Sequence, residues 1–303
     1  MAAEPGLTAR VVAIVGPTAS GKSVAGLAVA RAIGGEVVNA DSMQLYRGMD
    51  IGTAKVTATQ RDQVPHHLLD ALDVTEEASV AAYQDMARNA IADISARGRG
   101  VVLVGGSGLY VRAAIDDLRF PGTDPLVRAR LEDELAQVGA AALHERLRAR
   151  DPVAAESVLP TNGRRIVRAL EVMELTGRPF SDRAGMSVYE TVYDTRIAGI
   201  APDLATLDRR IEQRVDDMWA AGFVTEVRRL VDHGLRRSRT ASRALGYQQI
   251  LAFLAGECTE ATARDDTVRA TRRFARRQLS WFRRDPRVEW HPDAASAVRA
   301  LTV

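Results

Sequence analysis

The feature that most constrains how this chain can fold is a glycine-rich segment near its N-terminus, Gly16-Pro17-Thr18-Ala19-Ser20-Gly21-Lys22-Ser23. It has the pattern G-x-x-x-x-G-K-S, follows the apolar run Val11–Val15 and precedes a helix-like stretch. A strand, then this loop, then a helix is the order that binds phosphate, because backbone N–H groups and the N-terminus of the helix face the anion. Lys22 would add a positive charge, and the Ser23 hydroxyl is placed to ligand Mg²⁺. We therefore predict a phosphate-binding loop, with magnesium as cofactor.

Composition bounds the class of protein. The chain has 303 residues, of which 46% are hydrophobic and 26% charged, so it can form the core of one or two ordinary domains. No apolar run approaches the ~18 residues of a membrane-spanning helix, and residues 1–10 do not resemble a signal peptide. Cys258 is the only cysteine, which argues against a disulfide and a cysteine-based zinc site. We expect a cytoplasmic protein without membrane association.

Three further strands are expected, at residues 36–40, 101–104 and 196–201, with helices between and after them. This alternation of strands and helices favours a parallel sheet. The fold class we predict is therefore α/β, a P-loop NTPase-like parallel sheet covered by helices.

Residues 118–193 interrupt this pattern, because three helical segments rich in Ala, Leu, Arg and Glu follow a turn at residues 120–125. We expect a small all-helical insertion domain over 118–193. Residues 1–117 and 194–303 would form the core domain with its helical C-terminal part.

Asp41 is the acidic residue best placed beside the phosphate loop. It comes directly after the strand expected at 36–40, and ligands of parallel α/β sheets bind outside the carboxyl ends of strands. The strand at 101–104 runs into glycines instead, so it supplies no acid at its end. Asp41 could accept a proton or support a metal ion; a turn or helix-capping aspartate is the alternative interpretation.

The basic residues are almost all arginines, because only Lys22 and Lys55 among the 41 are lysines. A preference for arginine codons explains the arginines but not the survival of two lysines. We infer that Lys55, like Lys22, meets something that arginine cannot replace. His66 and His67 are adjacent and cannot share one face, so we interpret them as structural rather than as a metal-binding pair.

Two arginine clusters favour an anionic polymer as partner. One places five arginines on a single helix face without an acid on the same stripe: Arg269, Arg272, Arg273, Arg276 and Arg277. The other is Arg164-Arg165-Ile166-Val167-Arg168, inside the expected insertion. Two separated patches suit a folded RNA better than a small metabolite, although a solvated charged face is the alternative.

Four segments together resemble the tRNA dimethylallyltransferase family, whose members are also called tRNA isopentenyltransferases. They are Gly16–Ser23, Asp41–Lys55, Pro65–Asp70 and Gly105–Tyr110, and further matches run to Arg284. The stretch Asp41–Lys55 is the most specific of them, and the resemblance covers nearly the whole chain. No C-terminal zinc-finger motif is present in the sequence, so it is the bacterial form that the chain is similar to.

The resemblance implies transfer of a dimethylallyl group from dimethylallyl diphosphate to N6 of adenosine 37, beside the anticodon of a tRNA. It implies the anticodon stem-loop as the RNA partner, and we expect a monomer. The catalytic residues would be Asp41 and Ser107; Ser107 stands where the family commonly has threonine, and the hydroxyl is retained. The implied diphosphate-binding residues are Gly16, Pro17, Thr18, Ala19, Ser20, Gly21, Lys22, Ser23 and Arg214. Those implied for tRNA are Asp41, Ser42, Met43, Gln44, Arg164, Arg165, Ile166, Val167 and Arg168.

Three other functions remain open at the level of sequence. An isopentenyltransferase could act on free adenine nucleotides, but the insertion and the arginine-rich helix argue against it. A P-loop small-molecule kinase could use ATP, but the segment Asp41–Lys55 argues against that. A non-catalytic RNA-binding protein could use a nucleotide as a switch.

Overall fold

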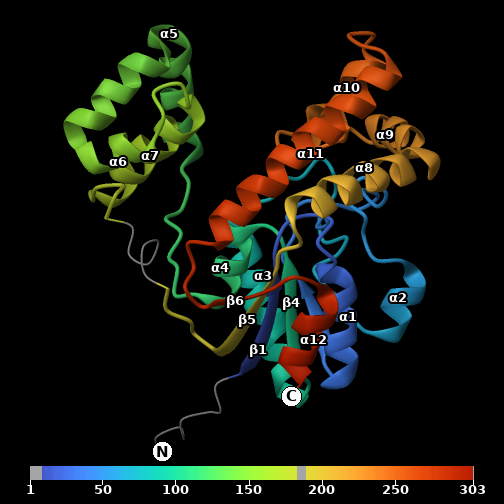
Figure 1. The fold of residues 1–303 in the computed structure, drawn as a ribbon. Helices are drawn as coiled ribbons and strands as arrows, with labels where there is room; N and C mark the ends of the chain where they lie inside the picture. The colour runs from blue at the N-terminus through green and yellow to red at the C-terminus, as the bar shows by residue number, and fades with distance from the viewer. Residues whose placement is uncertain (1–8, 183–188, 303) are drawn as a thin grey trace, which may run out of the picture. The chain divides into compact units, whose positions relative to one another are not determined.

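The computed structural model describes residues 9–182 and 189–302 (Figure 1). The chain divides into two compact units, one formed by Met1–Asp116 with Thr191–Val303 and the other by Asp117–Glu190. The sequence-based boundaries of 118–193 lie within three residues of this division. Within the described ranges, no helix combines the length and the apolar character that crossing a membrane requires.

The first unit is built on a six-stranded sheet with the order β3-β2-β4-β1-β5-β6, in which all neighbouring strands are parallel. Its strands are β1 (Arg10–Val15), β2 (Glu36–Asn39), β3 (His66–His67), β4 (Val101–Gly105), β5 (Asp194–Ile200) and β6 (Val288–His291). The α/β fold expected from the sequence is confirmed. The edge strands β3 and β6 are additional. β3 has only two residues, and in β6 only Val288 is buried, so neither has the apolar run that marks a central strand in a sequence.

Helices cover both faces of this sheet: α1 (Lys22–Ala32), α3 (Val80–Ala96), α4 (Gly108–Ile115) and α12 (Ala294–Thr302). Val12 and Ile14 of β1 belong to a hydrophobic cluster with residues of α1 and α12, which lie side by side in Figure 1. Successive strand residues point to opposite faces, so Val11 and Ala13 point to the other side, where α3 and α4 contact the strands. Burial on both faces explains why β1 reads as an uninterrupted apolar run.

A helical layer follows β5 and forms a core of its own. It consists of α8 (Leu204–Ala220), α9 (Phe223–Asp232), α10 (Tyr247–Leu254) and α11 (Glu260–Phe282), with short 3-10 turns at Leu235–Arg237 and Ala241–Arg243; the peripheral helix α2 is Ala58–Gln63. Tyr46 and Met49, from the loop after β2, are 0% exposed and pack in the same cluster as Phe223 and Tyr247. The segment Asp41–Lys55, which contains Tyr46 and Met49, is therefore packed against this helical layer.

The described part of the second unit contains three helices, α5 (Pro125–Arg150), α6 (Pro152–Ser157) and α7 (Gly163–Thr176). Each begins at a capping side chain that accepts backbone N–H groups: Asp124, Asp151 and Asn162. Gly139 interrupts α5 with φ +81°. Glu171 of α7 is buried and is held by Arg128 and Arg168, so an ion-pair group lies inside this small unit. The helical content expected for the insertion is present.

Candidate active site

Three loops that carry the predicted site residues leave the carboxyl ends of three adjacent strands. The phosphate loop follows β1, the segment Gly105–Gly108 follows β4, and Asp41 follows β2. Because these strands lie in the order β2-β4-β1, the loops meet at one edge of the sheet. The parallel topology thus assembles residues that are far apart in the sequence.

The phosphate loop has the backbone conformation that its glycines permit. Gly16 has φ +141°, and a Cβ there would lie 2.5 Å from the carbonyl oxygen of Ile200. Gly21, with φ +100°, turns the chain into α1, and Ala19 has φ +61° as well. The N-terminus of α1 consequently opens at the loop, where its unpaired N–H groups favour an anion.

Lys22 lies where a bound anion would stabilise its charged form. Its Nζ donates a hydrogen bond to the carbonyl oxygen of Pro17 at 2.5 Å. Burial lowers the pKa of Lys22 from its usual 10.5 to about 7, Asp41 opposes this shift, and Arg214 adds to it. A bound diphosphate would supply the negative charge that this buried ammonium lacks.

Two serines of the loop differ in their surroundings. Ser23 is exposed and makes no side-chain hydrogen bond with the residues described, so its hydroxyl is available to a ligand. Ser20 is 1% exposed, and its Oγ has no hydrogen-bond partner within the described part of the chain. No group of three or more His, Cys, Asp or Glu side chains among the described residues could hold a metal ion. A metal here would need ligands from Ser23, water and a bound anion.

Asp41 is oriented by its own loop. Its Oδ1 accepts a hydrogen bond from Met43 N at 2.9 Å, and its backbone is held at both ends by the Asn39 amide at 3.0 Å. Asn39 is fixed in turn by Leu68 O and by the hydroxyl of Tyr83. Within the described residues, the second carboxylate oxygen of Asp41 accepts no hydrogen bond, so it is open to a substrate proton.

Ser107 and Arg214 complete the set predicted for the diphosphate. Ser107 is the residue before α4 and its side chain makes no capping hydrogen bond, which leaves the hydroxyl beside a second helix N-terminus. Arg214, on α8, donates to Thr53 O at 3.2 Å. Burial lowers its pKa, against the effect of Asp41. Asp41 raises the pKa of both Lys22 and Arg214, against the effect of burial, so the carboxylate favours the charged form of both cations.

The sequence gives no signal for Gln278, which joins the two anion loops. This buried side chain of α11 accepts from Thr18 N and donates to Gly106 O, each at 2.9 Å. Glu226 of α9 is a second missed residue. Its carboxylate accepts from the backbone N–H groups of Asp50, Ile51 and Gly52 and from the hydroxyl of Tyr247.

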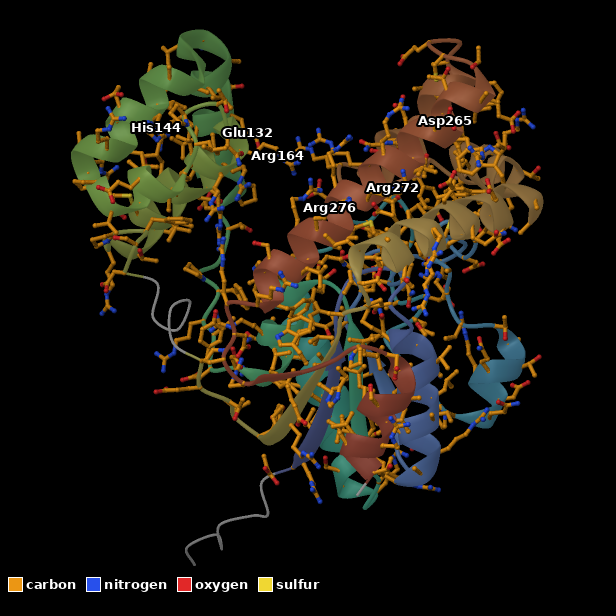
Figure 2. All side chains as sticks on the ribbon, in the orientation of Figure 1. Glu132, His144, Arg164, Asp265, Arg272 and Arg276 are labelled. Carbon is orange, nitrogen blue, oxygen red and sulfur yellow. The ribbon has the colours of Figure 1, made fainter. Side chains whose placement is uncertain are left out.

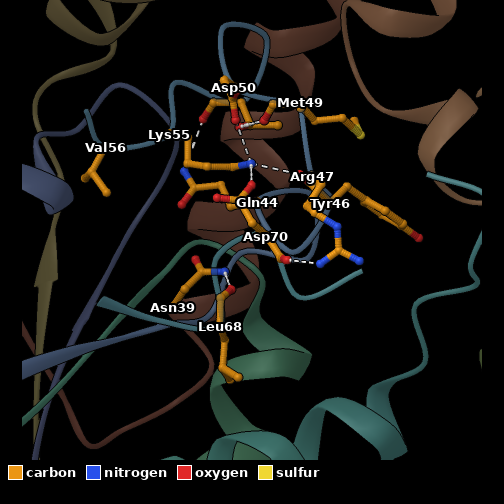
Figure 3. A network of polar contacts seen from close by, with 12 residues as sticks. Asn39, Gln44, Tyr46, Arg47, Met49, Asp50, Lys55, Val56, Leu68 and Asp70 are labelled. Carbon is orange, nitrogen blue, oxygen red and sulfur yellow. Dashed lines mark hydrogen bonds and ion pairs between the residues drawn. The ribbon is translucent and has the colours of Figure 1, made fainter. Parts of the chain in front are cut away.

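Lys55 has a structural role that suits a lysine. Its side chain is 1% exposed, and Nζ donates to Tyr46 O, Asp50 Oδ1 and Asp70 Oδ1 at 2.7, 2.8 and 2.6 Å (Figure 3). A compact ammonium satisfies three acceptors around one point, which a planar guanidinium does not do. His67 is structural too, because it forms an edge-strand pair and contacts Glu36.

The remaining loop residues predicted for RNA lie near Asp41. Ser42, Met43 and Gln44 are partly exposed, and Gln44 Nε2 donates to Thr53 O at 3.1 Å. The Gln44 side chain thus shares the carbonyl oxygen of Thr53 with Arg214, which ties this segment to Arg214.

The arginine stripe of α11 requires a correction. Arg272 and Arg276 lie along α11 (Figure 2). Arg272 contacts Glu212 and Arg276 contacts Asp208, so acids of the neighbouring helix α8 compensate two arginines that have no acid on their own stripe. Arg269 pairs with Asp266 on its own helix. Arg273 and Arg277 are exposed and form no ion pair within the described residues. They are the two stripe residues that remain available to a partner.

In the insertion, Arg164 and Arg165 are exposed on the first turn of α7. The side chains of Ile166 and Val167 are 0% and 1% exposed and pack in the core of that unit. Arg168 donates to Glu171 and to the carbonyl oxygens of Gly122 and Pro121. Of these five residues, only Arg164 and Arg165 have side chains that are available to contact RNA. Ile166, Val167 and Arg168 make their contacts within the unit.

Comparison with known proteins identifies the family of this chain. The IPP transferase family matches residues 44–285 of the chain. The chain belongs to this family. A tRNA dimethylallyltransferase of Streptomyces avermitilis is 63% identical over 292 residues, which cover 96% of this chain and 93% of that protein. One of Salinispora arenicola is 64% identical over 290 residues, covering 96% and 84%.

Solved structures of IPP transferases share the fold. The full-length tRNA isopentenylpyrophosphate transferase from Bacillus halodurans matches with a TM-score of 0.70 and 41% identity, covering 97% of this chain and 94% of that one. A eukaryotic dimethylallyltransferase acting on tRNA matches with a TM-score of 0.78 and 26% identity, covering 91% and 70%.

Proposed function

We propose that this chain transfers the dimethylallyl group of dimethylallyl diphosphate to N6 of adenosine 37 in tRNA, releasing diphosphate. The observation that carries the proposal is that the phosphate loop, the Ser107 loop and Asp41 follow the adjacent strands β1, β4 and β2, and that Arg214 shares Thr53 O with Gln44 of the Asp41 segment. Two cations next to two helix N-termini suit a diphosphate, and one carboxylate oriented beside them suits a proton acceptor. Relatives named tRNA dimethylallyltransferase over nearly the full length support the same reaction.

The diphosphate half of the donor would lie on the phosphate loop. Loop N–H groups, Lys22 and Arg214 bind its oxygens, and Ser107 donates from the neighbouring loop. The exposed hydroxyl of Ser23, which makes no side-chain hydrogen bond among the described residues, would hold a Mg²⁺ ion together with water and the diphosphate, as is common for Mg²⁺. When bound, the ion would neutralise charge on the leaving diphosphate. The loop N–H groups, Lys22 and Arg214 are already oriented toward the diphosphate before the reaction begins, so they stabilise the same negative charge.

The transfer itself is a substitution at the first carbon of the dimethylallyl group. The lone pair of adenine N6 forms the new C–N bond, the C–O bond breaks, and its electron pair leaves with the diphosphate. Asp41 accepts the proton that N6 loses, through the carboxylate oxygen that accepts no hydrogen bond among the described residues. An exocyclic amine on an aromatic ring is a weak nucleophile, so its orientation by Asp41 contributes as well.

The RNA would reach the site with the target base out of its stack, which costs a few kcal/mol. Residues 41–44 contact the nucleotides beside the flipped base, and Arg164 and Arg165 contact the backbone of the anticodon stem-loop. Specificity would follow from the base and the shape of its loop rather than from paired sequence. We propose that the enzyme acts as a monomer in the cytoplasm.

The test combines purified protein, Mg²⁺, dimethylallyl diphosphate and tRNA, followed by mass analysis of the nucleosides. We expect N6-dimethylallyladenosine at position 37, and the same product on an isolated anticodon stem-loop. Parallel reactions contain AMP in place of tRNA, or labelled ATP with candidate metabolites. Product on AMP alone, or transfer of phosphate from ATP, would assign the site to one of the alternative functions. Absence of product with donor and Mg²⁺ saturating would refute the proposal.

A further inference from the structure

Gln278 forms a direct link between two loops that are distant in the sequence. Its Oε1 accepts from Thr18 N and its Nε2 donates to Gly106 O, both at 2.9 Å. The two ends of one amide therefore meet a donor and an acceptor of the correct kind, and the side chain is only 6% exposed. Thr18 lies in the phosphate loop, and Gly106 precedes Ser107.

Close packing leaves the second loop little freedom beside α11. A Cβ on Gly106 would lie 2.4 Å from Gln278 Nε2, and a Cβ on Gly108 would lie 2.1 Å from the ring of Trp281. Trp281 is three residues after Gln278, on the same helix. The residues on either side of Ser107 are thus both seated against α11, and neither tolerates a side chain without displacing it.

The spacing of these loops matters to any ligand that uses both. The phosphate loop leads into α1, the Ser107 loop leads into α4, and both helix N-termini face the same edge of the sheet. Hydrogen bonds to a diphosphate have to be made from both loops at once, and a displacement of about 1 Å can cost about a hundredfold in rate. Strands β1 and β4 set the coarse distance between the loops, but the loops themselves extend beyond the ladder.

We infer that Gln278 is a positioning residue for the diphosphate: it holds the phosphate loop and the Ser107 loop at the separation that lets one diphosphate contact both. The inference rests on the proposed function, since the donor is the ligand concerned. Gln278 acts through Thr18 and Gly106 and does not itself contact the donor.

The test replaces Gln278 by Met, which keeps the length of the side chain and removes both hydrogen bonds. The matched control is Gln84→Met, because Gln84 is also buried and donates to Ala113 O, in the half of α4 away from Ser107. For each variant, calorimetry measures the Kd of inorganic pyrophosphate and of dimethylallyl diphosphate. RNA binding is measured without donor, and Tm and the steady-state constants for both substrates are recorded.

We expect Gln278→Met to raise the Kd of pyrophosphate and the KM of the donor about tenfold while the Kd of tRNA stays unchanged. Gln84→Met should lower Tm comparably and leave pyrophosphate binding as in the unmodified protein. A normal pyrophosphate Kd in Gln278→Met, or an equal loss in the control, would overturn the inference. Failure of the unmodified protein to prenylate tRNA would instead refute the proposed function, so the two failures are distinct.

Discussion

Lys55 Nζ and Asp70 Oδ1 lie 2.6 Å apart, and this ion pair joins the segment after β2 to the segment after β3. The two partners differ in exposure, with the lysine side chain 1% exposed and the aspartate 29%. Burial alone would raise the pKa of Asp70, but hydrogen bonds from Lys55 and Arg61 outweigh it and hold that pKa below its usual range. The loop that carries Asp41 is therefore closed by a charge contact at its far end.

Replacing Lys55 by Met should destabilise the protein by about 3 kcal/mol, because it leaves three acceptors without their shared donor. The value is at the lower end for a broken ion pair because water reaches Asp70. Chemical denaturation measures the change. Arg148→Met is the matched control, since Arg148 and Glu145 form an ion pair with both side chains more than half exposed. Equal shifts of the denaturation midpoint in both variants would contradict the role of Lys55.

The depressed pKa of Lys22 predicts a pH dependence of stability. The group titrates near 7 in the folded protein and near 10.5 in the unfolded chain. Between these values the unfolded state binds more protons, so folding becomes more favourable as pH rises from about 7 to 10.5. Lys22→Met lacks this titration. We expect the unfolding free energy of the unmodified protein, measured without anions, to increase relative to that of Lys22→Met as pH rises over this range. A difference between the two proteins that stays constant with pH would be inconsistent with burial of the ammonium.

Asp41→Asn should reduce turnover about a hundredfold, because the amide cannot accept the proton from N6. The variant retains an oxygen that can accept from Met43 N, so the loop should keep its shape. Single-turnover prenylation of tRNA measures the chemical step, and filter binding measures RNA affinity. A variant that turns over normally but loses RNA affinity would reassign Asp41 to RNA binding.

The corrected arginine stripe predicts a difference between two neighbouring residues of α11. Arg277→Gln should reduce the slope of log affinity for tRNA against log salt by about 0.7, the value for one neutralised phosphate of a single strand. Arg276→Gln is the control, because Arg276 already contacts Asp208 at 2.8 Å. The slope of the control should change less. Identical slopes for Arg277→Gln and the unmodified protein would make Arg277 part of a solvated face.

Those parts of the site that rest on local chain order could be predicted from the sequence. The phosphate loop and Asp41 each follow a strand directly, so the strand pattern alone places them at the edge of a parallel sheet. The starts of helices can be predicted for the same reason, since Asn162 and Asp151 carry capping side chains close in the sequence to the residues that they cap.

The rest depends on contacts between distant segments. Gln278 is one polar residue within a long arginine-rich helix, and nothing in its neighbourhood indicates that it meets Thr18. The ion pairs of the arginine stripe could not be predicted for the same reason, because Asp208 and Glu212 lie on a different helix. Burial of Ile166 and Val167 likewise follows from how α7 packs within its unit.

The bond from Thr18 to Gln278 spans 260 residues. A ribosome that adds about 5–20 residues per second needs roughly 13–52 seconds to cover that distance. During this interval the nascent chain contains the phosphate loop but not yet Gln278, which contacts it. The hydrogen bond from Thr18 N to Gln278 Oε1 can therefore form only after most of the chain has been synthesised.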